Sequence, residues 1–205
     1  METSFEYVGW ERLYELCFRL YERITRTDFV PDAIIGIARG GWVPARILSD
    51  LFFMNETANV KVDLYRGIFA RDKGAKVSQS IPDECEWDDP LVVDDVSDSG
   101  ESMIAALDHL RDRGLNDMKT ACLHMKPGTN LVPDFYVEET SSWIVYPWEL
   151  KEFVFTYATQ IAKEDASLED MEQDLLDLYL PLHYVRFFLE QWKERGGRDA
   201  FEMKQ

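Results

Sequence analysis

The sequence contains no run of about 18 apolar residues, the shortest length that crosses a bilayer as a helix. Its first residues, Met1–Phe5, include no basic region followed by an apolar one. We therefore expect no membrane partner and no signal peptide. Both absences lead us to predict a cytoplasmic protein.

Cysteine is also scarce. The three cysteines, Cys17, Cys85 and Cys122, stand far apart in the chain and form no CxxC pair. This spacing supports neither a disulfide framework nor a zinc site. We interpret all three as reduced thiols in a reducing compartment.

Positive charge is in deficit. The chain has 22 Lys and Arg residues against 39 Asp and Glu residues, which gives a formal net charge of −17 at pH 7. Such a chain repels polyanions at long range, so we expect no nucleic-acid partner. A small phosphorylated substrate is still compatible with this charge, provided that local cations, backbone amides and a metal ion hold it.

Apolar residues, by contrast, make up 46% of the 205 residues, which is enough for a core. Segments with helical spacing of apolar residues alternate with short apolar runs typical of buried parallel strands. Helices are expected at 9–27, 44–53 and 101–113, and strands at 32–38, 60–65, 91–93, 118–125, 135–138 and 143–146. The alternation predicts an α/β fold with a parallel, twisted sheet flanked by helices.

Residues 66–89 interrupt this alternation. They are polar, carry Arg66, Arg71, Lys73 and Lys76, and have only a weak pattern. We interpret them as a long, flexible loop with room for a short hairpin. Loops of this length inside compact domains often act as active-site lids.

The chain from about Leu150 onward is expected to be all helical. Ser167–Asp170 has the pattern of a capping box, Pro181 is placed to begin a helix, and Gly196–Gly197 to end it. We therefore predict a domain at 1–150 and a helical C-terminal extension at 151–205. The apolar faces of these helices must be covered by the first domain or by a sister subunit, and we predict a homo-oligomer.

The strongest functional signal is the segment 91–102, with the sequence LVVDDVSDSGES. A buried strand brings the adjacent carboxylates of Asp94 and Asp95 to the carboxyl edge of the sheet, where open α/β sheets bind ligands. The amides at the start of the next helix, with the hydroxyls of Ser99 and Ser102, form a phosphate cradle. Acids beside a phosphate site are reasonable if the ligand also presents hydroxyls and a metal ion, as a ribose phosphate does.

This segment resembles the signature by which type I phosphoribosyltransferases bind phosphoribosyl pyrophosphate (PRPP). The resemblance implies their fold and a Mg²⁺ ion held by Asp94 and Asp95, which also bind the ribose hydroxyls. Residues 98–102 would hold the 5′-phosphate. The PRPP-binding residues implied in this segment are Asp94, Asp95, Asp98, Ser99, Gly100, Glu101 and Ser102.

A second signal is Ala38–Gly41, an arginine and two glycines that follow the first expected strand. A glycine pair at this place is by itself equally compatible with a structural turn. Beside the PRPP signature it resembles the pyrophosphate loop of the same family, in which Arg39 and Gly40 would meet the pyrophosphate. The resemblance also implies a cis peptide between Ala38 and Arg39, and that the strands 32–38 and 91–93 end side by side.

A third signal concerns the base. The order of Lys126, Trp143 and Ile144 is similar to that in the 6-oxopurine branch of the family, the xanthine-guanine and hypoxanthine phosphoribosyltransferases. The resemblance implies that Lys126 donates to the oxygen on purine carbon six, that Trp143 stacks on the base, and that the Ile144 backbone reads its edge. An ammonium group favours a carbonyl over the amino group of adenine, which is itself a donor. Glu149 stands where the family often has an aspartate, so a role on a second metal is left open.

Together these signals predict a purine salvage transferase that makes a purine nucleoside 5′-monophosphate and pyrophosphate from PRPP and guanine, xanthine or hypoxanthine. Asp98 is the candidate catalytic residue, because it lies between the ribose acids and the phosphate loop and would take or steady the proton that the purine loses. His109, His124 and His183 belong to no matched motif, and we interpret them as structural or surface residues. Two alternatives stay open: a PRPP-binding regulator without catalysis, and a transferase for another base such as adenine, orotate or uracil.

Overall fold

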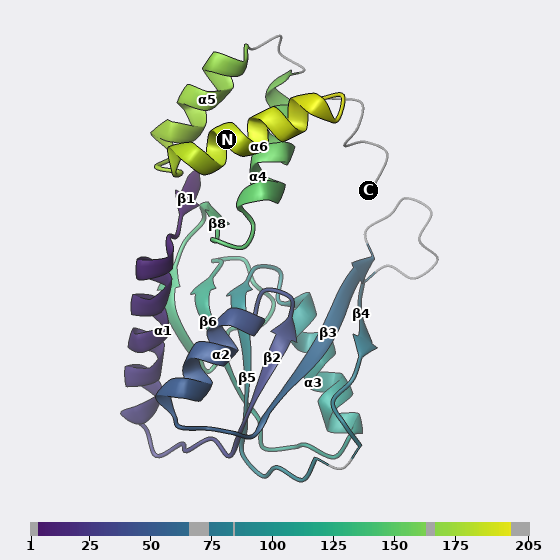
Figure 1. The fold of residues 1–205 in the computed structure, drawn as a ribbon. Coiled ribbons are helices and arrows are strands. Elements are labelled where there is room, and N and C mark those ends of the chain that lie inside the picture. Colours follow the sequence, from purple (N-terminus) through teal and green to yellow (C-terminus); the bar gives the residue numbers. More distant parts are fainter. Residues whose placement is uncertain (1–3, 66–73, 84, 163–166, 198–205) are drawn as a thin grey trace. The chain divides into compact units, whose positions relative to one another are not determined.

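The computed structural model describes residues 4–65, 74–83, 85–162 and 167–197 (Figure 1). The chain forms two compact units. Unit 1 combines residues 1–13 with residues 142–205, and unit 2 comprises residues 14–141. The predicted domain boundary at residue 150 stays a prediction.

Unit 2 is built on a six-stranded sheet with the order β4-β3-β2-β5-β6-β7. All neighbouring strands in it are parallel except β3 and β4, which are antiparallel. The strands are β2 (Ala33–Ala38), β3 (Thr57–Tyr65), β4 (Gly74–Gln79), β5 (Pro90–Ser97), β6 (Lys119–Met125) and β7 (Phe135–Glu139). The helices are α1 (Trp10–Thr25), which begins in unit 1, α2 (Trp42–Leu51) and α3 (Glu101–Asp112).

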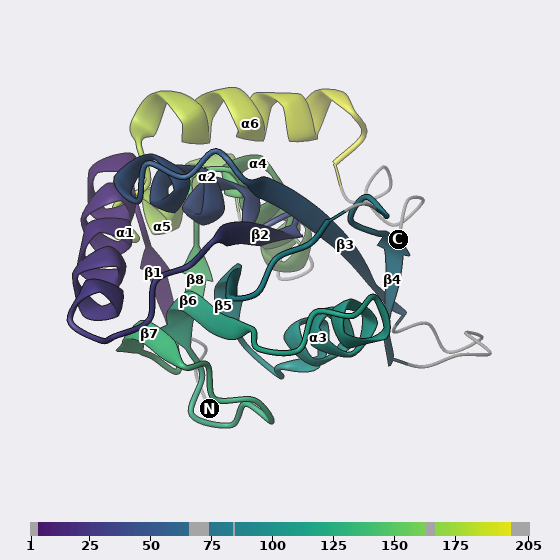
Figure 2. The ribbon, with the colours of Figure 1, turned by 90° about the horizontal axis from the view of Figure 1, so that it is seen from below.

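The central strands of this sheet are apolar because helices cover both of their faces. Figure 2 shows α2 and α3 on opposite sides of the sheet. Every residue of β2 is buried, as the short apolar run of its sequence predicts. Between the sheet and α3 lies a core of buried residues: Ile35, Ile37, Val60, Ile81, Val92, Met103, Ala106, Leu107, Leu110 and Leu115. The predicted α/β architecture with a mostly parallel sheet is confirmed.

The segment predicted as a long loop, 66–89, contains one regular element. Its residues 74–79 form β4, which pairs with β3 as the outer strand of the sheet. The described part of the segment thus contributes one strand, whose partner β3 precedes residue 66. Three cations of the predicted lid, Arg66, Arg71 and Lys73, lie outside the described residues, whereas Lys76 lies in β4 opposite Asp63.

Unit 1 joins the two ends of the chain in a small parallel ribbon. Its strands are β1 (Phe5–Tyr7) and β8 (Trp143–Val145), and its helices are α4 (Leu150–Ile161), α5 (Leu168–Asp177) and α6 (Leu182–Glu194). The sequence predicted β8 but not its partner β1. The helices pack around a buried cluster that also includes Val145 and is flanked by Phe5 and Tyr7. None of the described helices combines the length and apolar character that a bilayer span needs.

The ends of the C-terminal helices agree with the signals in the sequence. At the start of α5, the Asp170 amide donates to Ser167 Oγ at 3.1 Å and the Ser167 amide donates to Asp170 Oδ2 at 3.1 Å. This is the predicted capping box. Pro181 is the N-cap of α6, and Gly196 and Gly197 follow its C-cap with positive φ angles of 90° and 57°.

The cluster of unit 1 leads to a prediction about stability. Leu175 on α5 is 0% exposed, whereas Leu182 at the start of α6 is 41% exposed. Leu175→Ala is expected to lower the free energy of unfolding by about 2–5 kcal/mol, because it removes buried methyl groups and leaves a cavity. Leu182→Ala is the matched control and is expected to cost less than about 1 kcal/mol. Urea unfolding of both variants tests this, and equal losses would contradict the buried packing of α5.

Candidate active site

The loop after β2 and the acids of β5 meet at one edge of the unit 2 sheet. The strands β2 and β5 are parallel neighbours, with Gly36 opposite Val93. A Cβ atom built on Gly40 would lie only 2.2 Å from Asp95 Oδ2, so the Asp95 carboxylate lies directly against the Gly40 backbone. The peptide between Ala38 and Arg39 is cis, as the resemblance implied. The expected side-by-side ending of these two strands is confirmed.

The two carboxylates of β5 are held in buried positions. Asp94 is 8% exposed and Asp95 is 7% exposed. Each accepts a hydrogen bond from the next backbone amide: the Asp95 amide donates to Asp94 Oδ1 at 2.9 Å, and the Val96 amide donates to Asp95 Oδ1 at 2.8 Å. These bonds fix the direction in which each carboxylate points.

Burial disfavours the charged form of both acids. It raises the pKa of Asp94 well above its ordinary value, and the nearby charge of Asp95 raises it further. It also raises the pKa of Asp95 to about 6, against the opposing effect of the hydrogen bond from the Val96 amide. Adjacent buried carboxylates of this kind are stabilised as anions by a cation or by hydroxyl donors. The oxygen donors present therefore fit a hard cation such as Mg²⁺.

The loop between β5 and α3 leads through a tight turn into the N-terminus of the helix. Gly100 is the N-cap of α3 and adopts a left-handed conformation with a φ of 80°. The Glu101 amide donates to Ser99 Oγ at 3.4 Å, which orders the turn before the helix. Asp98 and Glu101 are exposed, whereas Ser99 and Ser102 are half-buried. The α3 N-terminus and its hydroxyls thus stand beside the two buried acids, at the edge where the sequence placed them.

Lys126 follows the next strand of the same sheet. Met125, the last residue of β6, lies opposite Ser97 of β5, and the Lys126 amide donates to the Ser97 carbonyl at 2.9 Å. This hydrogen bond fixes the backbone of Lys126, whose side chain is half-buried, next to the end of β5. Unit 2 thus brings together, at adjacent strand ends, the predicted residues Arg39, Gly40, Asp94, Asp95, 98–102 and Lys126.

The other predicted base-binding residues, Trp143 and Ile144, belong to unit 1. They lie in β8, where Phe5 of β1 is opposite Trp143 and Glu6 is opposite Ile144. Ile144 is buried, but the Trp143 side chain is 58% exposed. Trp143 lines a cavity of about 720 Å³ within unit 1, together with Phe5 of β1, Phe153 and Tyr157 of α4, and Glu149, the N-cap residue of α4. An exposed indole beside a cavity is accessible to a flat ring.

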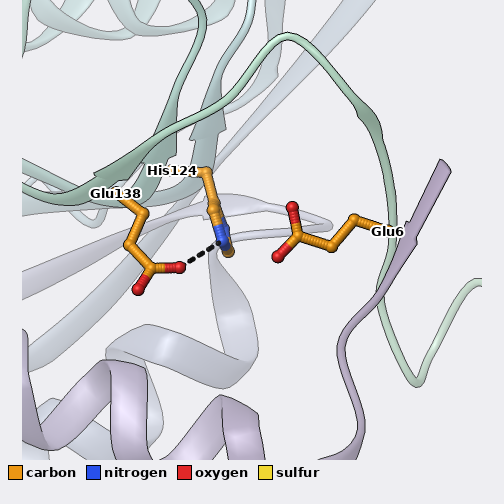
Figure 3. Close-up of side chains that lie close together, drawn as sticks. All are labelled: Glu6, His124 and Glu138. Atoms are coloured by element: carbon orange, nitrogen blue, oxygen red, sulfur yellow. Dashed lines mark ion pairs between the residues drawn. The ribbon is translucent and has the colours of Figure 1, made fainter. Parts of the chain in front are cut away.

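Each of the three histidines lies against a neighbouring side chain. His124 in β6 is completely buried, and its Nε2 lies 3.6 Å from Glu138 Oε2 in β7, the ion pair drawn in Figure 3. Glu138 also accepts a hydrogen bond of 2.6 Å from Arg19 in α1. His109 is within 2.7 Å of Ser80, and the His183 ring is 3.8 Å from that of Tyr184. These contacts support the interpretation of the histidines as structural or surface residues.

Sequence reasoning missed the residues that connect the loops around this site. Thr129 and Asn130 follow Lys126 in a loop that is hydrogen-bonded to Ser97 and Ser99. The residue types alone gave an indication, since the sequence Gly-Thr-Asn at 128–130 favours a turn. Nothing in a single sequence indicates which other loop such a turn contacts.

Close packing at Gly41 leads to a second prediction. A Cβ atom there would lie 2.3 Å from the Val93 carbonyl oxygen and 2.7 Å from that of Ile37. Because both are backbone atoms of β5 and β2, they have little freedom to move away. Gly41→Ala is expected to destabilise the protein by about 1–3 kcal/mol or more. Gly128→Ala, where a Cβ would have no atom within 4 Å, is the control and should leave the melting temperature unchanged; an equal shift in both variants would contradict the packing.

The fold and this arrangement at the sheet edge define a class of protein. Residues 6–160 match the model of the phosphoribosyl transferase domain. The chain belongs to the phosphoribosyltransferase family, and its unit 2 sheet with the adjoining loops is the type I fold of that family.

Relatives within the family are named for purine bases. The chain is 31% identical over 146 residues to the xanthine-guanine phosphoribosyltransferase of Idiomarina loihiensis, a match that covers 70% of this chain and 86% of the relative. It is 27% identical over 196 residues to the hypoxanthine-guanine phosphoribosyltransferase of Saccharomyces cerevisiae, covering 73% and 88%. Among solved structures, the purine phosphoribosyltransferase of Pyrococcus horikoshii Ot3 is similar with a TM-score of 0.62 and 34% identity, covering 71% of this chain and 93% of that chain.

Proposed function

We propose that this chain is a Mg²⁺-dependent 6-oxopurine phosphoribosyltransferase. It would join guanine, xanthine or hypoxanthine to PRPP and release a purine nucleoside 5′-monophosphate and pyrophosphate. The observation that carries this proposal is the contact of Gly40 with the Asp95 carboxylate. PRPP presents a pyrophosphate and ribose hydroxyls from adjoining carbons, so a site for it needs a pyrophosphate loop and hydroxyl-binding acids side by side.

The PRPP contacts follow from the chemistry of the groups at this edge. Asp94 and Asp95 accept hydrogen bonds from the ribose hydroxyls and hold Mg²⁺, whose charge keeps both acids ionised despite their burial. Residues 98–102 bind the 5′-phosphate through the α3 N-terminus and the hydroxyls of Ser99 and Ser102. Arg39, which is exposed beside Gly40, donates charge-assisted hydrogen bonds to the pyrophosphate.

The base contacts are those that the resemblance to the family implies. Lys126 donates to the oxygen on purine carbon six, Trp143 stacks on the ring, and the Ile144 backbone reads the edge of the base. The names of the relatives support a 6-oxopurine, since both curated proteins act on guanine together with xanthine or hypoxanthine by name.

The reaction transfers the anomeric carbon of the ribose from pyrophosphate to a purine nitrogen. Its transition state has the oxocarbenium character of glycosyl transfer, with negative charge developing on the leaving pyrophosphate. When bound, Mg²⁺ supplies positive charge to that leaving group. Arg39 stabilises the same charge from the protein side. Asp98, the exposed residue that follows β5, takes or steadies the proton that the purine loses.

The test is a panel of bases with PRPP and Mg²⁺, in which nucleotide product is measured directly by chromatography. We expect product with at least one of guanine, xanthine and hypoxanthine, and little or none with adenine, orotate or uracil. Binding of PRPP without product from any base would instead identify a PRPP-binding regulator and overturn the proposal. A cytoplasmic location and a homo-oligomeric state complete the proposal; fractionation of cells and light scattering on the purified protein test them.

A further inference from the structure

Two loops of unit 2 that belong to different strands are joined by a set of hydrogen bonds. One is the phosphate loop, residues 98–102, and the other is the Lys126 loop, residues 126–131. The Lys126 loop is short and tied at its start, where the Lys126 amide donates to the Ser97 carbonyl at 2.9 Å. It then turns back on itself, with the Thr129 amide donating to the Lys126 carbonyl at 3.1 Å. The position of the Lys126 backbone is therefore set by the end of β5.

Side chains strengthen this connection. The Ser97 hydroxyl, in a residue that is 2% exposed, lies 2.9 Å from Thr129 Oγ1 and donates to the Leu131 carbonyl at 2.9 Å. The Asn130 amide and its side-chain Nδ2 both donate to the Ser99 carbonyl, at 3.0 Å and 3.1 Å. Buried hydroxyls are costly to leave without partners, so the contact between Ser97 and Thr129 resists opening. We call these contacts of Ser97 and Ser99 with Thr129 and Asn130 the loop latch.

The backbones of the two loops also pack without spare room. A Cβ atom on Gly100 would lie 2.8 Å from the Leu131 amide nitrogen and 2.9 Å from Thr129 Oγ1. Gly100 is itself the N-cap residue of α3 within the phosphate loop. A displacement of the phosphate loop therefore reaches Thr129 and Leu131 directly, because there is no gap to absorb it.

We propose that Thr129 and Asn130 are positioning residues that couple the two substrates through the loop latch. The inference rests on the proposed function, in which the phosphate loop binds PRPP and Lys126 binds the base. Bound PRPP fixes the conformation of the phosphate loop. The hydrogen bonds of the loop latch then fix the conformation of the Lys126 loop, and Lys126 is held where it can donate to the base. The affinity for the base is accordingly higher when PRPP is bound, and by linkage the base raises the affinity for PRPP by the same factor.

The test compares variants at Thr129 that differ in the hydroxyl. Thr129→Val removes the hydroxyl and keeps the shape, whereas Thr129→Ser keeps the hydroxyl. Calorimetry gives the dissociation constant of 9-deazaguanine, in which carbon replaces the attacking nitrogen, with and without Mg²⁺ and PRPP. The ratio of these two constants is the coupling factor. Thr129→Val is expected to reduce the coupling factor and raise the KM for the base by about 3- to 10-fold, as for loss of one or two neutral hydrogen bonds.

The remaining measurements separate positioning from general damage. The dissociation constant of PRPP in the absence of base should stay within about twofold of the parent in Thr129→Val, and Thr129→Ser should restore the coupling factor. Asn130 is exposed, and its backbone bond to Ser99 remains in Asn130→Ala. This variant should reduce the coupling factor about threefold, and it replaces Thr129→Val in the test if Thr129→Val does not fold. Gly128→Ala, in the same loop with open space around it, should leave all constants unchanged.

Two results would overturn the inference without affecting the proposed function. One is that the parent is active and that Thr129→Val and Asn130→Ala both have the same coupling factor as the parent. The other is a parallel loss of PRPP affinity, base affinity and melting temperature, which is the signature of a merely structural role. A parent that forms no nucleotide in the base panel would overturn the proposed function, and the coupling with it.

Discussion

Excess chelator is expected to abolish nucleotide formation, and added Mg²⁺ is expected to restore it. PRPP and pyrophosphate are anionic, and the chain carries a formal net charge of −17. Asp94 and Asp95 add two buried carboxylates at the proposed site for the ribose and pyrophosphate. Without a cation, these charges repel one another in surroundings of low dielectric constant, where the repulsion is strong. Turnover should therefore fall to the limit of detection.

The measurement is product formation at saturating PRPP and base, with EDTA in excess over total divalent cation. EDTA saturated beforehand with Mg²⁺ is the control, because it retains any effect of the chelator that is unrelated to metal removal. The melting temperature of the free protein with and without EDTA separates loss of activity from loss of structure. Full turnover in excess chelator would exclude the metal role of Asp94 and Asp95.

Lys126→Met is expected to lower kcat/KM for the preferred 6-oxopurine by about 10- to 100-fold, because an unpaired buried polar group costs about 1–3 kcal/mol. Under the proposed function the Lys126 ammonium donates to the oxygen on carbon six, and methionine would leave that oxygen without its donor. Affinity for PRPP should change little, since Asp94, Asp95 and the phosphate loop belong to a different strand end. Adenine need not become a substrate, because removal of a donor does not create the acceptor that its amino group requires.

Lys119→Met is the matched control for this variant. Lys119 begins β6, the strand that Lys126 follows, but its side chain pairs with Asp134 at 3.0 Å and is 46% exposed. Loss of such a surface pair costs at most about 1 kcal/mol of stability, and kcat/KM should equal that of the parent. If Lys126→Met uses guanine, xanthine and hypoxanthine as the parent does, Lys126 is a solvated lysine without a role in base selection.

Much of unit 2 could be predicted from the sequence, because its signals are local. The apolar runs of β2 and β5 are buried along their whole length or nearly so, which is what continuous apolar segments in a parallel sheet require. The boundaries of α3 follow from the glycines at both ends, Gly100 and Gly114, each with positive φ. The acids and the phosphate loop were located because a strand, a turn and a helix follow one another within a dozen residues.

Contacts between distant segments could not be predicted in the same way. The strand β1 has three residues, all half-buried, and it pairs with β8, which follows more than 130 residues later in the chain. So short a segment carries no periodicity that distinguishes it from a loop. The loop latch is similar, because Thr129 and Asn130 contact Ser97 and Ser99 about 30 residues away, at separations that the hydrogen bonds alone reveal.

The pairing of β1 with β8 has a consequence for synthesis on the ribosome. Ser4 and Ser142, which are hydrogen-bonded at 2.8 Å, are separated by 138 residues. At roughly 5–20 residues per second, β1 leaves the ribosome about 7 to 28 seconds before its partner strand does. Unit 2 can complete its sheet during this interval, whereas Phe5 and Tyr7 remain without the helices that later pack beside them. The nascent chain therefore passes through a stage in which one half is folded and the other exposes an apolar strand, the state in which chaperones bind.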